Sequence, residues 1–503
     1  MAPSFLSKLR DQSLFIQKCS VDGQWTAARS GKTFNVENPA TSEVLGTCPE
    51  FSKQDTETAI VAAAQAFYSF RTTTARSRAK LLRQWYDLML EHSDDLSLLV
   101  TLENGKPLEE AKGEVAYAAS FLEWFSEEAP RTYGDTIPAT IPGNQVITIK
   151  EPVGVCALIT PWNFPAAMIT RKAGAALAAG CTVVIKAPAE TPFTANALVE
   201  LAHRAGVPKG VVNVITTDKN IVEVGHALTS SPLVKKVSFT GSTNIGKLLM
   251  RQCAETTLKK ISLELGGNAP FIVFDDADID AAVQGALISK FRSSGQTCVC
   301  ANRIFVQDAV YDKFASKLAA HVRDKFVVGD SLKTAMVTHG PLIHDRAVQK
   351  VHEHVTDAVS KGARILAGGQ KVPQLGPNFF QPTVLAGMTG DMKLAAEETF
   401  GPVAGLFRFK TEQDVVKLAN GTEMGLAAYF FTKDNQRAWR VAKALEAGMV
   451  GLNTGSISDP AAPFGGIKSS GFGREGSKYG IEEYMTVKMI TVGGLETPVQ
   501  SRL

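Results

Sequence analysis

One run of the sequence alternates short apolar segments with amphipathic ones, and this alternation constrains the fold more than any other feature. Residues 153–159 are apolar and strand-sized, and residues 166–179 follow with helical spacing. Later segments of both kinds continue the pattern: strands at 182–185, 211–215 and 236–239, and helices at 193–205 and 245–254. Alternation of this kind implies parallel strands joined by right-handed crossovers. We therefore predict a doubly wound α/β domain, which binds nucleotides at the carboxyl ends of its strands.

The remainder of the chain is too long to share that one core. At 503 residues, two or three domains are expected. Apolar residues recur at helical spacing over 56–70 and 75–100, whereas 1–50 reads as short strands and turns. Residues 129–153 are rich in Thr, Pro, Gly and Val and alternate from Gln145 to Ile149. This stretch is predicted to leave the main body as an extended ribbon.

Composition excludes several classes of function. The chain carries 53 Lys and Arg against 50 Asp and Glu, with no basic run that interleaves aromatics, so no nucleic-acid partner is expected. No apolar stretch reaches membrane-spanning length and the N-terminus lacks a signal core, so neither a membrane partner nor secretion is expected. Seven irregularly spaced cysteines indicate a reducing compartment. We expect a cytoplasmic protein, with the mitochondrial matrix as the alternative.

Cys298 is the candidate nucleophile. It follows Gly295-Gln296-Thr297, small and flexible residues that let backbone amides approach whatever the sulfur attacks. An isolated cysteine is more often an inert core residue. Cys298 and Cys300 are one residue apart, and no His pair lies near them, so no metal site is expected.

Two other segments offer groups that a nucleophilic thiol needs. Thr160-Pro161-Trp162-Asn163-Phe164-Pro165 presents an amide, and Leu263-Glu264-Leu265-Gly266-Gly267-Asn268 presents a carboxylate. Taken alone, Asn163 could be a turn residue and Glu264 a capping or salt-bridging residue. The three segments together favour chemistry over packing.

The ordered motifs resemble those of the aldehyde dehydrogenase family. Four further segments match in the family's order: Asn38-Pro39-Ala40-Thr41, Phe239-Thr240-Gly241-Ser242, Glu397-Glu398-Thr399-Phe400-Gly401-Pro402 and Pro463-Phe464-Gly465-Gly466. The resemblance implies two doubly wound parallel-sheet domains and a β-ribbon that pairs subunits into a homo-oligomer, a dimer or a tetramer. The implied boundaries are 1–128 with 150–263 for the coenzyme domain, 264–477 for the catalytic domain, and 129–149 with 478–503 for the oligomerisation element.

The resemblance also implies a mechanism. Cys298 would attack an aldehyde to give a thiohemiacetal whose oxyanion is held by the Asn163 amide and the Cys298 backbone N–H. After hydride transfer to NAD(P), water activated by Glu264 would hydrolyse the thioester. A thiol hydrolase needs only the nucleophile, oxyanion hole and base, so coenzyme dependence separates the two classes. A non-catalytic structural role is disfavoured because all three groups are present.

The coenzyme loop is predicted at Gly241-Ser242-Thr243-Asn244-Ile245-Gly246, where a strand meets a helix N-terminus. A structural turn is the alternative. The stretch Gly471-Phe472-Gly473-Arg474-Glu475-Gly476 fits a dinucleotide fingerprint, but no buried strand precedes it, so we reject it. The resemblance implies these coenzyme-binding residues: Thr160, Pro161, Trp162, Lys186, Ala189, Gly241, Ser242, Gly246, Leu265, Glu398 and Phe400.

Ala189 marks a departure from the family pattern. The usual Lys-Pro-x-Glu ends in a glutamate that binds the adenosine ribose and repels a 2′-phosphate. Here the stretch reads Lys186-Ala187-Pro188-Ala189-Glu190, which puts Ala189 at the glutamate position unless Glu190 shifts into it. Without that charge the repulsion is absent, so NADP is the expected coenzyme and NAD the alternative.

Two arginines indicate the substrate. Guanidinium groups bind carboxylates through two hydrogen bonds, so Arg171 and Arg292 facing one tunnel would select an aldehyde with a distal acid group. For either residue alone, a surface position is the default. The surrounding stretches resemble family members that oxidise succinate semialdehyde, with Ser458 as a third carboxylate contact. Glutarate semialdehyde or another ω-carboxy aldehyde is the alternative.

Cys300 is a candidate redox residue. A disulfide between thiols flanking one residue would be strained, easily reduced and blocking for the nucleophile. Family members with this Cys-x-Cys are redox-sensitive. A packed small residue is an equally good interpretation.

Overall fold

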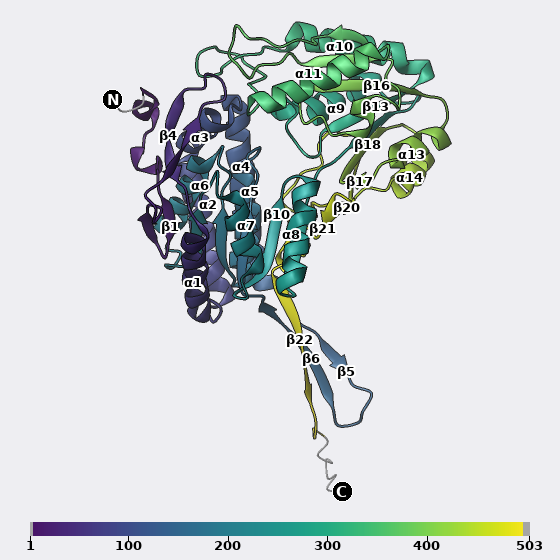
Figure 1. Cartoon of the computed structure of the whole chain (residues 1–503). Coiled ribbons are helices and arrows are strands. Elements are labelled where there is room, and N and C mark those ends of the chain that lie inside the picture. Colours follow the sequence, from purple (N-terminus) through teal and green to yellow (C-terminus); the bar gives the residue numbers. More distant parts are fainter. Residues whose placement is uncertain (1–3, 496–503) are drawn as a thin grey trace.

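The computed structural model describes residues 4–495 and contains two α/β lobes, from which a narrow β-ribbon projects (Figure 1). Each lobe is built on one mainly parallel sheet, so the predicted α/β class with two such sheets is confirmed. Residues 1–3 and 496–503 lie outside the described residues. The outer ends of the expected segments 1–128 and 478–503 are therefore not covered.

The first sheet has the strand order β2-β1-β9-β8-β7-β10-β11-β21. Its five central strands are parallel: β7 (Val155–Ile159), β8 (Thr182–Lys186), β9 (Val212–Ile215), β10 (Val234–Thr240) and β11 (Lys260–Glu264). Chain order runs outward from β7 in both directions, as in a doubly wound sheet. Antiparallel strands close the edges: β1 (Cys19–Val21), β2 (Gln24–Thr26) and β21 (Gly471–Phe472). Sequence reasoning found β7 to β10 and expected the short strands within 1–50, but it missed β11 and β21.

Alternate residues of the central strands pack in two different hydrophobic cores, because successive side chains point to opposite faces of the sheet. Cys156 and Leu158 pack with one group of helices, and Val155 and Ala157 pack with another. The first group is α2 (Ala75–Glu91), α3 (Ser93–Asn104), α4 (Leu108–Glu128), α5 (Ala167–Ala179) and α6 (Pro192–Arg204). The second is α1 (Lys53–Phe70), α7 (Ile221–Ser230) and α8 (Thr243–Thr256). Burial on both faces explains why β7 is apolar throughout and why β8 and β9 are mostly apolar.

The helical stretch predicted over 75–100 is present, but it is not one continuous helix. It is two helices, α2 and α3, which meet at His92, whose φ of −98° and ψ of 20° are not helical. Asp95 near the start of α3 accepts hydrogen bonds from the Arg10 and Asp11 backbone N–H groups, a contact that is distant in sequence. Apolar periodicity continues across the break, so the pattern gave no sign of it.

The second sheet has the order β14-β15-β16-β13-β12-β18-β19. All neighbours are parallel except β14 with β15. Its strands are β12 (Ala269–Val273), β13 (Ala301–Gln307), β14 (Arg364–Ala367), β15 (Thr383–Ala386), β16 (Val403–Phe409), β18 (Ala427–Phe431) and β19 (Met449–Leu452). Helices α9 (Ile279–Phe291) and α10 (Tyr311–Lys325) cover one face. Helices α11 (Asp345–Ser360), α13 (Glu412–Asn420) and α14 (Asn435–Ala444) cover the other.

The ribbon is a three-stranded antiparallel sheet in the order β22-β6-β5. Strand β6 (Gln145–Pro152) pairs along its whole length with β22 (Met485–Val492), and β5 (Thr136–Pro138) lies on its other side. Figure 1 shows it pointing away from both lobes. The predicted extended stretch is present, although a 3-10 turn over Ala129–Arg131 precedes it. Apolar side chains are exposed on it: Ile137, Ile149, Val487, Met489, Ile490 and Val492. Within residues 4–495, no helix is long and apolar enough to cross a membrane.

Candidate active site

The predicted catalytic residues come together where the two sheets face each other. Glu264 ends β11, and Asn163 follows β7, so both lie at the carboxyl edge of the first sheet. Cys298 belongs to the loop that enters β13 of the second sheet. The Asn163 side-chain amide donates a 2.9 Å hydrogen bond to the Gln296 carbonyl, two residues before the cysteine. Segments distant in sequence thus meet at one place.

The loop before Cys298 has an unusual backbone. Ser293, Ser294 and Gly295 are consecutive residues in the left-handed region, with φ of 53°, 52° and 76°. Non-glycine residues in that region cost free energy and persist only where their surroundings hold them. Gly295 admits no side chain, because a Cβ there would lie 2.2 Å from the Gly401 carbonyl oxygen. The Ser293 N–H donates to Glu110 at 3.0 Å.

Cys298 is half-buried and its thiol is free. Burial raises the pKa of Cys298 to about 12; the guanidinium of Arg171 opposes this shift, and the carboxyl groups of Glu398 and Glu264 add to it. The thiol form therefore predominates at neutral pH. A nucleophile in this state needs a base or a bound cation to ionise it.

Glu264 is buried, and neither of its carboxyl oxygens has a hydrogen-bond partner in the described part of the chain. Burial and the nearby charge of Glu475 raise the pKa of Glu264 well above its ordinary value, whereas Arg171 and Lys172 lower it. An unpartnered carboxyl group next to a thiol is poised to bind a water or to take up a proton. The Asn163 Oδ1 is likewise buried and unpartnered within residues 4–495.

The three predicted substrate residues surround Tyr117 on α4. Burial raises the pKa of the Tyr117 hydroxyl above its ordinary value, whereas the charges of Arg171 and Arg292 and the nearby Ser458 side chain lower it. Arg292 stacks over the Phe164 ring at 5.1 Å, next to Asn163. Two guanidinium groups, a hydroxyl and a phenol thus converge at one place, where a carboxylate would find several donors.

Arg171 is buried and held along one edge. Its Nε forms an ion pair with Glu475, and its guanidinium lies 4.3 Å over the Phe464 ring. Its Nη2 has no hydrogen-bond partner among the described residues. Burial alone would lower the pKa of Arg171, but Glu475 and other acidic groups raise it above its ordinary value. The charge is therefore permanent, and one donor is free.

The predicted coenzyme loop joins β10 to α8. A Cβ on Gly241 would lie 2.4 Å from the Phe239 ring, and one on Gly246 would lie 2.5 Å from Leu265. Ser242 caps α8 without a side-chain hydrogen bond, so the first N–H groups of the helix stay available to an anion. The close approach of small residues at a helix N-terminus fits a pyrophosphate.

Lys186 is the last residue of β8, so it lies at the same edge of the sheet as the loop between β10 and α8. Its side chain is buried. Burial lowers the pKa of Lys186, and the charges of Glu190, Asp218 and Glu50 partly offset this. Its carbonyl accepts the Thr160 N–H at 3.3 Å, and Pro161 is half-buried beyond it. Ala189 is half-buried and packs on the first core.

Glu398 and Phe400 lie in the segment that enters β16. Burial raises the pKa of Glu398 to about 7, although its carboxylate accepts the Gly267 N–H at 3.2 Å. Phe400, with a left-handed φ of 52°, makes an edge-to-face contact with Trp162 at 5.7 Å. These groups from the second lobe face the loops of the first, which is where a dinucleotide spanning both lobes would place its nicotinamide half.

Cys300 is buried, and its thiol donates to the Lys290 carbonyl at 3.5 Å. Burial raises the pKa of Cys300, whereas the charge of Lys290 lowers it. The Lys290 Nζ itself is buried without a hydrogen-bond partner in residues 4–495. All seven cysteines are free thiols.

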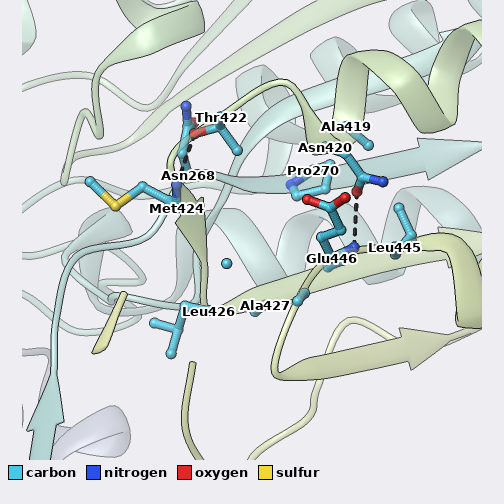
Figure 2. Close-up of a pocket in the computed structure, with 13 residues that line it drawn as sticks. Asn268, Pro270, Ala419, Asn420, Thr422, Met424, Leu426, Ala427, Leu445 and Glu446 are labelled. Atoms are coloured by element: carbon cyan, nitrogen blue, oxygen red, sulfur yellow. Dashed lines mark hydrogen bonds between the residues drawn. The ribbon is translucent and has the colours of Figure 1, made fainter. Parts of the chain in front are cut away.

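A small hollow in the second lobe is lined by Asn268, Asn420 and Glu446, among others (Figure 2). In Figure 2 the Glu446 N–H donates to Asn420 at 2.9 Å and the Met424 N–H to Thr422 at 3.2 Å. Its volume of about 10 Å³ holds one water at most. It is therefore too small for a substrate. No group of three or more metal-ligating side chains occurs in the part of the chain described.

Sequence reasoning missed several residues of this site. Tyr117 reads as an ordinary position of an amphipathic helix, and Glu475 lies within the rejected glycine stretch. Lys172 is buried and pairs with Glu475 next to Arg171. Each has long-range partners, so local spacing carried no signal for them.

Comparison with known proteins identifies the class of protein. The sequence model of the aldehyde dehydrogenase family matches residues 25–490. The chain belongs to the aldehyde dehydrogenase family. It is therefore an oxidoreductase that uses NAD(P), as the resemblance in the motifs predicted.

Individual relatives are similar over almost their whole length. The chain is 59% identical to the NADP(+) succinate-semialdehyde dehydrogenase of Escherichia coli strain K12, over 97% of this chain and 100% of the relative. It is 58% identical to the glutarate-semialdehyde dehydrogenase of Pseudomonas aeruginosa, with the same coverage. The crystal structure of succinate-semialdehyde dehydrogenase from Burkholderia pseudomallei superposes with a TM-score of 0.95 at 56% identity, over 97% of this chain and 100% of that one.

Proposed function

We propose that this enzyme oxidises succinate semialdehyde to succinate with NADP. The observation that supports this most directly is the convergence of Arg171, Arg292 and Ser458 around Tyr117. A carboxylate bound there would orient an aldehyde toward Cys298. Burial raises the pKa of the Cys298 thiol, and the charge of the same Arg171 lowers it, because the two groups are near each other. Relatives named for succinate and glutarate semialdehyde support a substrate with an acid group at the far end.

In the proposed chemistry, the Cys298 thiol gives its proton to Glu264, which passes it to solvent, and the sulfur attacks the aldehyde carbon. The resulting oxyanion accepts hydrogen bonds from the Asn163 amide and the Cys298 N–H. When bound, the coenzyme would accept the hydride that leaves the adduct carbon, and a thioester would remain on Cys298. Glu264 then takes a proton from water as the water attacks the thioester, which releases the acid and restores the thiol. The unpartnered carboxyl oxygens of Glu264 support this role.

The preference for NADP rests on Ala189. A glutamate at this position would place a negative charge near a ribose 2′-phosphate, and alanine removes it. Lys186 is three residues away and forms no ion pair within 4.0 Å in the described residues, so its charge would attract the extra phosphate. Thr160, Pro161, Trp162, Gly241, Ser242, Gly246, Leu265, Glu398 and Phe400 complete the proposed coenzyme site.

We also propose that the enzyme is a homo-oligomer in the cytoplasm. The ribbon of β5, β6 and β22 exposes apolar side chains and ends in an edge strand, β22, so a second copy would bury both. The seven free thiols fit a reducing compartment.

Glutarate semialdehyde is the second candidate substrate, because a relative of nearly equal identity is named for it. It has one more methylene, which a hydrophobic tunnel discriminates by only about 10- to 200-fold. The deciding experiment measures kcat/KM for both semialdehydes and for butanal with each coenzyme, through the absorbance of reduced nicotinamide. The proposal requires succinate semialdehyde with NADP to rank first. Product formation without coenzyme would instead indicate a thiol hydrolase.

A further inference from the structure

We propose that Lys106, Glu110 and Glu114 are positioning residues that hold the two halves of the oxyanion hole in register from one helix. This inference rests on the proposed function, because it assigns the oxyanion to the Asn163 amide and the Cys298 N–H. Glu110 and Glu114 lie four residues apart on α4 and therefore share one face, and Lys106 lies in the segment just before this helix.

The first arm of this arrangement holds the Asn163 segment. Lys106 and Glu114 form an ion pair whose side chains are 1% and 0% exposed. The Lys106 ammonium also donates to the Asn163 carbonyl at 2.9 Å and lies 3.8 Å from the centre of the Phe164 ring. The other oxygen of Glu114 accepts the Ala166 N–H at 2.9 Å. The pair thus binds the main chain on both sides of Phe164.

The second arm holds the segment that leads to Cys298. The Glu110 carboxylate accepts the Ser293 N–H at 3.0 Å, at the first of the three left-handed residues. Such a backbone persists only where its surroundings hold it. The Asn163 amide then bridges the two arms through the Gln296 carbonyl. The position of each oxyanion donor is therefore set by a carboxylate of the same helix.

Stability alone does not account for this ion pair. Two buried charges of opposite sign contribute little net stability compared with apolar residues of similar volume. The pair supplies directional hydrogen bonds instead. The ammonium has three donors and the carboxylate two acceptor oxygens, and together they fix the main chain at defined points. A displacement of about 1 Å at a reacting group can cost about 100-fold in rate.

The test is a double-mutant cycle on the rate of coenzyme reduction at saturating substrate. The double variant Lys106→Met/Glu114→Leu removes both charges and should stay folded. We expect it to lower that rate about 100-fold with little change in coenzyme Kd. In an Asn163→Ala background, the same double substitution should lower the rate less than about 3-fold, because the group it positions is already gone.

Lys236→Met is the matched control. Lys236 is a fully buried lysine paired with Glu483, away from Asn163, and its loss should lower the Tm without changing the rate. Full additivity in the cycle, or an equal rate loss in the control, would overturn the positioning role while leaving the proposed function intact. If Asn163→Ala alone leaves the rate unchanged, the oxyanion assignment and the positioning role both fail.

Discussion

Arg171 on α5 and Glu475 near the chain's end form a buried ion pair that leaves one nitrogen of the guanidinium without a partner. Lys172 binds the other oxygen of Glu475, so one carboxylate neutralises two neighbouring cations. Glu475 thereby fixes which edge of the Arg171 guanidinium faces Tyr117, Arg292 and Ser458.

Glu475→Gln should destabilise the protein by about 3 to 5 kcal/mol, because it leaves two buried cations uncompensated. Urea unfolding at pH 7 measures this. Arg171 and Lys172 outweigh burial and lower the pKa of Glu475 below its ordinary value, so this stability is present above pH 4.5 and is lost as the pH falls further. The control is Glu482→Gln, whose pair with Lys150 is 48% exposed on the carboxylate side and should contribute less than about 1 kcal/mol. Equal losses in both variants would contradict the prediction.

Arg292→Met should lower kcat/KM for succinate semialdehyde by about 100-fold, because it removes a charge-assisted hydrogen bond to the substrate carboxylate. With butanal, which has no acid group, the change should stay below about 3-fold. Arg323→Met, at a guanidinium 61% exposed, is the control and should change neither value. A uniform loss on both aldehydes would show that Arg292 does not read the carboxylate.

Ala189→Glu should lower kcat/KM with NADP at least about 10-fold. The reason is that a carboxylate about 4 Å from the ribose 2′-phosphate of NADP would repel this phosphate by about one to several kcal/mol. Catalysis with NAD should be retained. Ala189→Gln adds a side chain of the same size without the charge, and so separates repulsion from crowding. Equal losses for the two coenzymes in both variants would refute the electrostatic argument.

Alkylation of Cys298 by iodoacetamide should be slow at pH 7 in the coenzyme-free enzyme and should rise about tenfold per pH unit up to pH 9. The reason is the pKa of about 12, which leaves the thiolate fraction proportional to hydroxide over this range. Mass spectrometry of the labelled peptide follows the rate. A plateau below pH 9 would mean that the thiol ionises far more readily than its burial implies.

Peroxide should inactivate the enzyme reversibly if Cys300 forms a disulfide with Cys298, and Cys300→Ala should then lose this reversibility. A disulfide across one intervening residue is strained and is readily reduced by dithiothreitol. Activity after peroxide, with and without dithiothreitol, measures the effect. Cys253→Ala, at a cysteine in the α8 helix, serves as the control and should behave as the parent does. Identical recovery in Cys300→Ala would exclude the switch.

Much of the fold was predictable because its signals are local. Mostly apolar runs mark β7 to β9, which are buried on both faces. Gly241 and Gly246 mark a place where backbone and side chains approach closely. The break at His92 was not predictable, because the apolar periodicity of α2 continues into α3. The Asp95 carboxylate near the start of α3 binds the main chain of Arg10 and Asp11, which are distant in sequence.

The sequence by itself determined the α/β class, the family, and the residues Cys298, Glu264 and Asn163 as candidates, since each is carried by a short motif. Only the tertiary structure decided which charges meet: Arg171 with Glu475, and Lys106 with Glu114 beside Asn163. The residues around each partner in the sequence give no indication of the residue with which it pairs. A buried charge is tolerated only where packing brings it a partner, and packing is a property of the folded chain as a whole.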